Sequence, residues 1–113
     1  MILTLPSLPP PLSACFKNVR RNGRAATSRY TAWSAEAMHA VRTQKVAPVS
    51  GAVVAVYQFR RPDLRRRDLG NLEKAVSDLL VKAGLIEDDS LIVDLRMLWG
   101  SEAPVTITVT PAI

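Results

Sequence analysis

Residues 60–94 read RRPDLRRRDLGNLEKAVSDLLVKAGLIEDDSLIVD, and this stretch decides the expected fold. It begins with arginines, continues into an amphipathic segment and ends in an acidic turn. Apolar side chains recur at helical spacing at positions 72, 75, 76, 79, 80 and 83, which predicts a helix with one buried face. Asp68 stands where an N-cap or first-turn acid would stabilise this helix, and Gly84 stands where a left-handed residue would end it.

The sequence on either side of this helix predicts a sheet and a second helix. Residues 51–59 (GAVVAVYQF) are apolar on both faces, as in a central strand, and residues 91–99 and 105–110 alternate as strands do. Residues 2–5 predict a short strand, and residues 30–46 an amphipathic helix that ends before Pro48. We therefore expect one α+β domain over residues 1–113, with a small mixed sheet packed against two main helices.

Residues 13–29 lack a clear periodicity and are rich in basic side chains. They surround Asn22-Gly23, a dipeptide typical of turns, and we interpret the segment as a basic arm or loop. A solvated, mobile segment and a DNA contact are equally compatible with this pattern. The basic residues of the arm that we expect to meet DNA are Lys17, Arg20, Arg21 and Arg24.

Composition indicates a polyanionic partner. The 113 residues carry a net charge of +5, with a pI near 10.0, which favours nucleic acid. The single Cys15 cannot form an internal disulfide, which fits a reducing compartment. No apolar run approaches the roughly 20 residues that cross a bilayer, and the proline-rich start is unlike a signal peptide. These features predict a soluble cytoplasmic protein without a membrane partner.

The central stretch combines phosphate-binding and metal-binding side chains. Guanidinium groups bind phosphate oxygens in pairs of hydrogen bonds, and five arginines fall within eight positions: Arg60, Arg61, Arg65, Arg66 and Arg67. Asp68, Asp88 and Asp89 supply the hard oxygen ligands that Mg²⁺ prefers, and Lys74 could stabilise charge on a phosphate. The alternative interpretations are a solvated basic face, a helix cap at Asp68 and a hydrophilic turn at Asp88-Asp89.

Chain geometry separates these acids. A helix from Asp68 to Ala83 rises roughly 22 Å, and the five residues that follow return at most about 17 Å when fully extended. Asp68 and the Asp88-Asp89 pair therefore cannot easily share one metal within a chain. Two antiparallel subunits would bring them together, so we expect a homodimer with two sites related by its two-fold axis.

The chain contains two distinctive motifs, RRRDLGNLEKAVSDLL and, shortly after it, a segment within KAGLIEDDSLIVDLR. In this order and at this spacing they resemble the RusA family of Holliday junction resolvases. The proline-rich start LPSLPPP resembles the family more weakly. The resemblance implies a small α+β homodimer that binds four-way junction DNA in recombination and repair. It also implies Mg²⁺-dependent cleavage of two opposed strands, with no small-molecule cofactor. By the same resemblance Asp68, Asp88 and Asp89 match metal-binding aspartates, Lys74 matches an essential lysine, and 65–67 match the basic run before the motif.

Gly70 departs from the family pattern, which has aspartate there: DLGN stands in place of DLDN. Glycine supplies no carboxylate, and it costs about 1 kcal/mol of helix propensity relative to alanine. The departure leaves three functions open: an active endonuclease, a catalytically inactive junction-binding protein of the same fold, and a generic basic nucleic-acid-binding protein.

Overall fold

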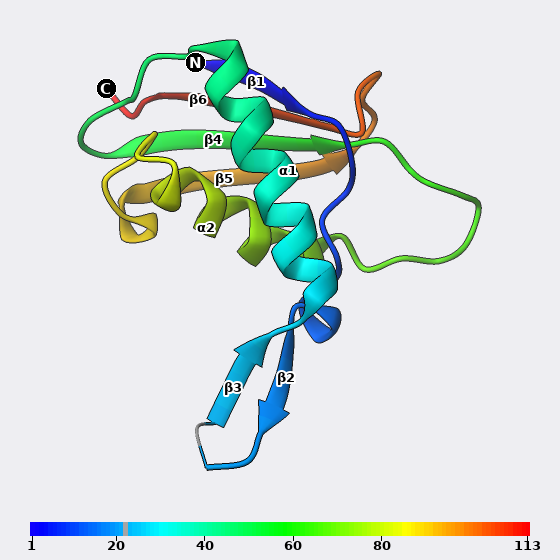
Figure 1. Ribbon diagram of the computed structural model, residues 1–113. Coiled ribbons are helices and arrows are strands. Elements are labelled where there is room, and N and C mark those ends of the chain that lie inside the picture. Colours follow the sequence, from blue (N-terminus) through cyan, green and yellow to red (C-terminus); the bar gives the residue numbers. More distant parts are fainter. Residues whose placement is uncertain (22) are drawn as a thin grey trace.

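The fold is described by a computed structural model, which covers residues 1–21 and 23–113. Its main element is a four-stranded sheet with the spatial order β1 (Ile2–Leu5), β6 (Val105–Pro111), β4 (Val53–Phe59) and β5 (Ile92–Trp99) (Figure 1). β4 runs parallel to β5 and antiparallel to β6, and β1 runs antiparallel to β6. The sheet is therefore mixed, and the predicted α+β class is confirmed.

β4 is the central strand, as the sequence predicted. Its side chains alternate in burial because successive residues point to opposite faces of the sheet and the helices cover only one face. Four of them, Val53, Ala55, Tyr57 and Phe59, are fully buried. The matching face of β6 contributes Val105, Ile107 and Val109, and β1 contributes Leu3 and Leu5. These side chains form the sheet's half of a single hydrophobic core.

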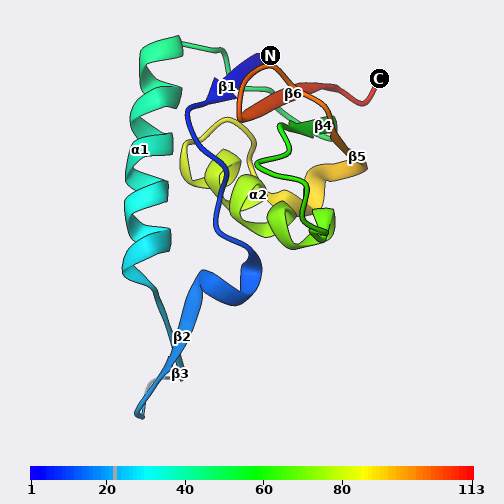
Figure 2. The ribbon, with the colours of Figure 1, turned by 90° about the vertical axis from the view of Figure 1, so that its right-hand side faces the viewer.

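Both main helices, α1 (Ser28–Gln44) and α2 (Glu73–Lys82), cover the same face of the sheet (Figure 2). The Thr27 side chain caps α1 by accepting a hydrogen bond from the Tyr30 N–H at 3.2 Å. α2 connects the parallel strands β4 and β5 and buries the apolar stripe predicted for it, including Ala75, Val76, Leu79 and Leu80. The βαβ unit thus contains most of the motif-bearing stretch.

The start of the second helix differs from the prediction. We expected one helix from Asp68, but residues Leu69–Leu72 form the short 3₁₀ helix η2, and α2 begins at Glu73. The Asp68 carboxylate accepts a hydrogen bond from the Gly70 N–H at 3.0 Å, and the Asn71 N–H donates to the Asp68 carbonyl. This local bonding competes with an α-helical turn, and Gly70 favours the helix least of the residues there.

Residues 12–26 contain more regular structure than the sequence indicated. A 3₁₀ turn η1 (Leu12–Ala14) leads into the antiparallel strands β2 (Phe16–Val19) and β3 (Gly23–Ala26), which project away from the sheet (Figure 1). The predicted turn at Asn22-Gly23 includes Asn22, which lies outside the described residues. The strands were missed because a two-stranded hairpin with exposed faces has no buried side on which apolar residues would alternate.

β5 differs from the simple alternation expected over residues 91–99. Leu91 belongs to the 3₁₀ turn η3 (Asp89–Leu91), and the ladder with β4 has an irregularity where Val93 has no partner residue. Beyond it, Leu95, Met97 and Trp99 lie opposite the buried residues of β4. None of the helices in the described residues has the length and apolar character needed to span a membrane.

Candidate active site

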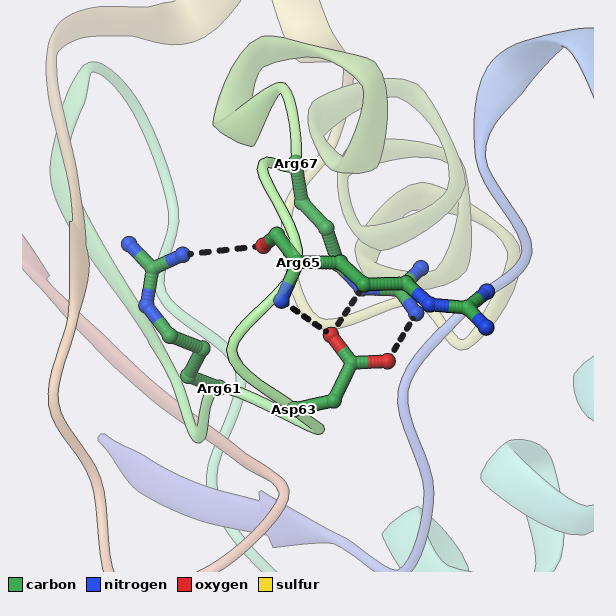
Figure 3. A network of polar contacts seen from close by, with 4 residues as sticks. All are labelled: Arg61, Asp63, Arg65 and Arg67. Atoms are coloured by element: carbon green, nitrogen blue, oxygen red, sulfur yellow. Dashed lines mark hydrogen bonds and ion pairs between the residues drawn. The ribbon is translucent and has the colours of Figure 1, made fainter.

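The loop from Arg60 to Arg67, here called the arginine loop, connects the end of β4 to η2 and is held by internal hydrogen bonds (Figure 3). The Asp63 carboxylate accepts two hydrogen bonds from the Arg67 guanidinium, at 3.1 and 2.6 Å, and one from the Arg65 N–H at 3.0 Å. These contacts, led by the one from Arg67, lower the pKa of Asp63, so it is ionised at neutral pH. Asp63 therefore organises the loop.

The arginines of this loop fall into two groups. Arg60 donates to the Glu102 carbonyl at 2.7 Å, and the Arg61 guanidinium lies 4.7 Å from the centre of the Trp99 ring. In contrast, within residues 1–21 and 23–113 the Arg65 and Arg66 guanidinium groups make no hydrogen bond or ion pair. The loop thus uses some of its arginines for its own shape and leaves two charges available to a ligand.

Asp68 lies in a cleft of about 380 Å³ beside the arginine loop. One of its carboxylate oxygens caps η2 through the Gly70 N–H. Asp68 was predicted to cap the α-helix, but the N-cap of α2 is Leu72, which makes no side-chain cap hydrogen bond. A Cβ atom at position 70 would lie 3.4 Å from the capping oxygen of Asp68, at the lower limit of ordinary contact distances, so the backbone accepts a Cβ beside Asp68. The other residues that line the cleft are Leu8, Pro9, Pro11, Arg29, Pro62, Arg66, Arg67, Asn71, Leu72 and Trp99.

Lys74 is paired with a carboxylate on its own helix. Its ammonium group lies 3.1 Å from the nearer oxygen of Asp78, one turn further along α2, and both side chains are partly exposed. An exposed pair of this kind holds its partners weakly, so Lys74 remains free to exchange Asp78 for a phosphate. The sequence places Lys74 and Asp78 on one polar stripe of the helix, and their spacing of four residues is typical of helical ion pairs.

Asp88 and Asp89 lie beyond the other end of α2. Asp88 caps η3 by accepting hydrogen bonds from the Ser90 N–H, at 3.1 Å, and from the Ser90 hydroxyl. Both bonds favour the charged form and lower the pKa of Asp88, the hydroxyl bond most. Asp88 and Asp89 line a second, more open depression with Phe16, Tyr30, Asp78, Val81 and Lys82. The predicted metal ligands are thus divided between two depressions.

Within the described part of the chain, no three His, Cys, Asp or Glu side chains lie close enough to hold a metal ion together. Asp68 at one end of α2 and the Asp88-Asp89 pair at the other are not brought together within one subunit. The β2–β3 hairpin carries the predicted basic residues: Lys17 lies on β2, Arg24 on β3, and Arg20 and Arg21 between the two strands. The Arg24 guanidinium lies 5.0 Å from the centre of the Phe16 ring.

Comparison with known proteins identifies the family. The model of the family described as endodeoxyribonuclease RusA matches residues 9–110, which include every candidate residue above. The chain belongs to the RusA family. This match confirms the resemblance found in the sequence motifs.

RusA relatives match this chain over part of their length. A crossover junction endodeoxyribonuclease RusA of Escherichia coli strain K12 is 53% identical over 45 residues, which cover 40% of this chain and 35% of that protein. Its counterpart of Enterobacteria phage HK97 is 46% identical over 43 residues, 38% and 36% of the two chains. That of E. coli O139:H28 strain E24377A is 53% identical over 52 residues. The matched segments thus span about a third to two fifths of the length of these RusA proteins.

The sequence motifs did not indicate two residues of the candidate site, Asp63 and Trp99. Asp63 stands four residues before Arg67, a spacing at which opposite charges often pair, and this signal was available in the sequence. Trp99 joins the cleft from the end of β5, next to Phe59 of β4. No sequence signal indicates this, because the contact depends on the parallel register of the two strands.

Proposed function

We propose that this chain is a metal-dependent endodeoxyribonuclease that resolves four-way DNA junctions in recombination and repair. It would act in the cytoplasm as a homodimer, each chain being a single domain with a basic arm at residues 13–29. RusA family membership and the activity for which the matched relatives are named support this proposal. The observation that carries it is the cleft in which Asp68 lies directly beside the arginine loop.

DNA would be held by two basic surfaces. Arg65 and Arg66 are exposed, and among the described residues their guanidinium groups make no hydrogen bond or ion pair, so these groups can bind phosphate oxygens without breaking existing contacts. Arg67 would contribute to the same surface while fixed by Asp63. The hairpin residues Lys17, Arg20, Arg21 and Arg24 would extend the contact along another arm of a junction. Binding should weaken with salt at a log–log slope of about −0.9 per phosphate neutralised on duplex DNA.

The donor set suits magnesium. Asp68, Asp88 and Asp89 are exposed carboxylates, the ligands that magnesium prefers. Asp68 and Asp88 each use one carboxylate oxygen to cap a 3₁₀ turn, and the other oxygen remains accessible to a metal ion. Bound Mg²⁺ would polarise the scissile phosphate and lower the pKa of an attacking water. Lys74 would leave Asp78 to stabilise charge on the phosphate or the leaving oxygen. Asp68 and Asp89 would have the catalytic roles together with Lys74.

A catalytically inactive junction-binding protein is the second candidate, and Gly70 is the observation that favours it. The RusA resemblance calls for a carboxylate at this position, and a Cβ there would meet only Asp68, at 3.4 Å. If two acids are needed at this end of α2, the chain would bind junctions through its arginines but would not cut them.

Cleavage of a synthetic four-way junction with Mg²⁺, comparing the natural chain with Gly70→Asp, tests both candidates. Cleavage by the natural chain supports the enzyme as proposed. Cleavage by Gly70→Asp alone identifies a binder that lacks one ligand. If neither protein cuts, and neither prefers junctions to duplex DNA, the chain is a generic basic nucleic-acid-binding protein and the proposal is wrong.

A further inference from the structure

The outer edge of β5 has the features of a strand-pairing surface. β5 is the last strand of its sheet, and among residues 1–21 and 23–113 it pairs only with β4. Two apolar residues near its middle are exposed: Val93 has 63% and Leu95 has 37% of its surface accessible to solvent. An edge that offers unpaired peptide groups together with apolar side chains is a template for another strand.

Hydrogen bonding defines which peptide groups of this edge are available. At the end of the strand pair, the Gly100 N–H donates to the Phe59 carbonyl at 2.7 Å, so residue 100 bonds toward β4. Because successive peptide groups of a strand point to alternate sides, Leu95, Met97 and Trp99 direct theirs toward the open edge. An incoming antiparallel strand must pair with these residues through outward-facing residues of its own.

We propose that β5 of a second copy of this chain occupies this edge, antiparallel, with the two-fold axis at Leu95. This inference rests on the homodimer in the proposed function and specifies its interface. An axis at Leu95 pairs outward-facing residues with one another and sets Asp94 opposite Arg96 of the partner subunit, twice by symmetry. The neighbouring axes would set Asp94 opposite Asp94 of the partner subunit, or Arg96 opposite Arg96 of the partner subunit. Like charges directly opposite are unfavourable, so charge favours the axis at Leu95 over these two neighbouring axes.

Edge charges often serve to prevent pairing, and here they permit it in one arrangement. Asp94 and Arg96 are exposed on the face of the sheet away from the helices, and neither is in an ion pair within the described residues. In antiparallel sheets the pairs that lack backbone hydrogen bonds bring side chains closest, and Asp94 with Arg96 of the partner subunit would be such a pair. The apolar Val93 would lie opposite Met97 of the partner subunit.

This register also completes the divided site. Leu91 of the partner subunit would come opposite Trp99, at the end of β5 where Trp99 lines the Asp68 cleft. The acidic turn directly precedes Leu91, so Asp88 and Asp89 of the partner subunit would reach the cleft from the open edge. Two composite sites would form, one at each end of the strand pair.

Charge-reversal variants test this interface through molecular mass, measured by sedimentation without metal or DNA. The natural chain should be a dimer. Asp94→Arg and Arg96→Asp each place like charges opposite one another at two positions, and each should raise the dimer Kd about 30-fold or more. The double variant Asp94→Arg/Arg96→Asp restores opposite charges within one chain and should dimerise again. An equimolar mixture of the two single variants should form a heterodimer.

Arg42→Asp on α1 is the matched control, because it reverses an exposed charge away from the edge and should leave the mass unchanged. Rescue in the double variant and in the mixture separates loss of pairing from loss of folding. A natural chain that is monomeric, single variants that remain dimeric, or a mixture that stays monomeric would each overturn the proposed interface. Single variants that remain dimeric, or a mixture that stays monomeric, leave the proposed homodimeric nuclease standing. A monomeric natural chain would overturn the homodimer as well, but not the cleavage activity, which the junction assay measures separately. An inactive natural chain leaves the interface standing.

Discussion

The two ends of α2 differ in charge and in how they are attached to the sheet. At the N-terminal end, the buried Tyr57 hydroxyl lies 2.9 Å from the Ser77 hydroxyl, which in turn donates to the Glu73 carboxylate. This end carries the arginine loop and Asp68. At the C-terminal end, Gly84 ends the helix, the Leu85 carbonyl accepts from the Val49 N–H at 2.9 Å, and an acidic turn follows. A helix with fixed ends thus keeps Asp68 and the arginine loop apart from the Asp88-Asp89 pair within each chain.

The largest expected effect is a loss of cleavage when the proposed metal ligand at either end of α2 is removed. Removing a group that only orients a metal ligand typically costs 10–100-fold in affinity or activity, and Asp68→Asn or Asp89→Asn would remove a proposed ligand itself. Each variant should therefore lower cleavage by about a hundredfold or more. The measurement is incision of a four-way junction by whichever chain, natural or Gly70→Asp, is active.

Mixing the two variants tests whether the two ends act in one composite site. If each site takes Asp68 from one subunit and Asp89 from the other, the mixture should regain activity. About half of randomly paired dimers are mixed and one of their two sites is intact, so about a quarter of all sites should cut.

The control for this complementation mixes Asp68→Asn with the double variant Asp68→Asn/Asp89→Asn. No combination of these chains supplies both acids to one site, so this mixture should stay inactive. If the first mixture also stays inactive although mixed dimers form, both acids act within one chain and the composite site is wrong.

The next largest effect concerns the buried Tyr57 hydroxyl, which contacts Ser77 of α2 and should make the stability of the protein depend on pH. Burial raises the pKa of Tyr57 to about 12, above its ordinary value near 10. The folded state therefore holds this proton more tightly than the unfolded chain. Its contribution to stability is fully present below pH 10 and is lost as the pH rises to about 12. The loss should approach about 2–3 kcal/mol, because a pKa difference of one corresponds to roughly 1.4 kcal/mol.

Urea unfolding of the natural chain and of Tyr57→Phe between pH 9 and 12 measures this loss. Phenylalanine cannot ionise, so the variant should lack most of the decline in unfolding free energy over this range. Tyr30→Phe is the matched control, because Tyr30 is less buried although its pKa is also raised. An equal decline in the natural chain and Tyr57→Phe would mean that other groups, such as the lysines, destabilise the protein at high pH.

The sequence predicted most of the fold, for reasons visible in particular elements. α2 was predicted because its apolar residues repeat at one period, and β4 because a short β-branched apolar run indicates a strand, although the helices cover only one of its faces. The β2–β3 hairpin was missed because neither face is buried. For the candidate site, the sequence located Asp68, Lys74 and the Asp88-Asp89 pair but indicated neither the Asp63 contacts of the arginine loop nor the place of Trp99. Those contacts depend on loop shape and strand register, which residue spacing does not determine.

The smallest expected effect compares the glycines at the two ends of α2. Gly84 has φ of 73°, and it donates to the Val81 carbonyl while Leu85 donates to the Leu80 carbonyl, as in a Schellman motif. No atom lies within 4 Å of a Cβ at this position, so Gly84→Ala should cost only the backbone strain, about 1–2 kcal/mol. Gly70 is not left-handed, and its Cβ would meet only Asp68 at 3.4 Å. Gly70→Ala should therefore be neutral or stabilise by up to about 1 kcal/mol. Urea unfolding of both variants measures the two changes in unfolding free energy. If Gly70→Ala destabilises the protein as much as Gly84→Ala does, the Asp68 cap cannot accommodate a side chain at position 70. An aspartate would then not fit there either.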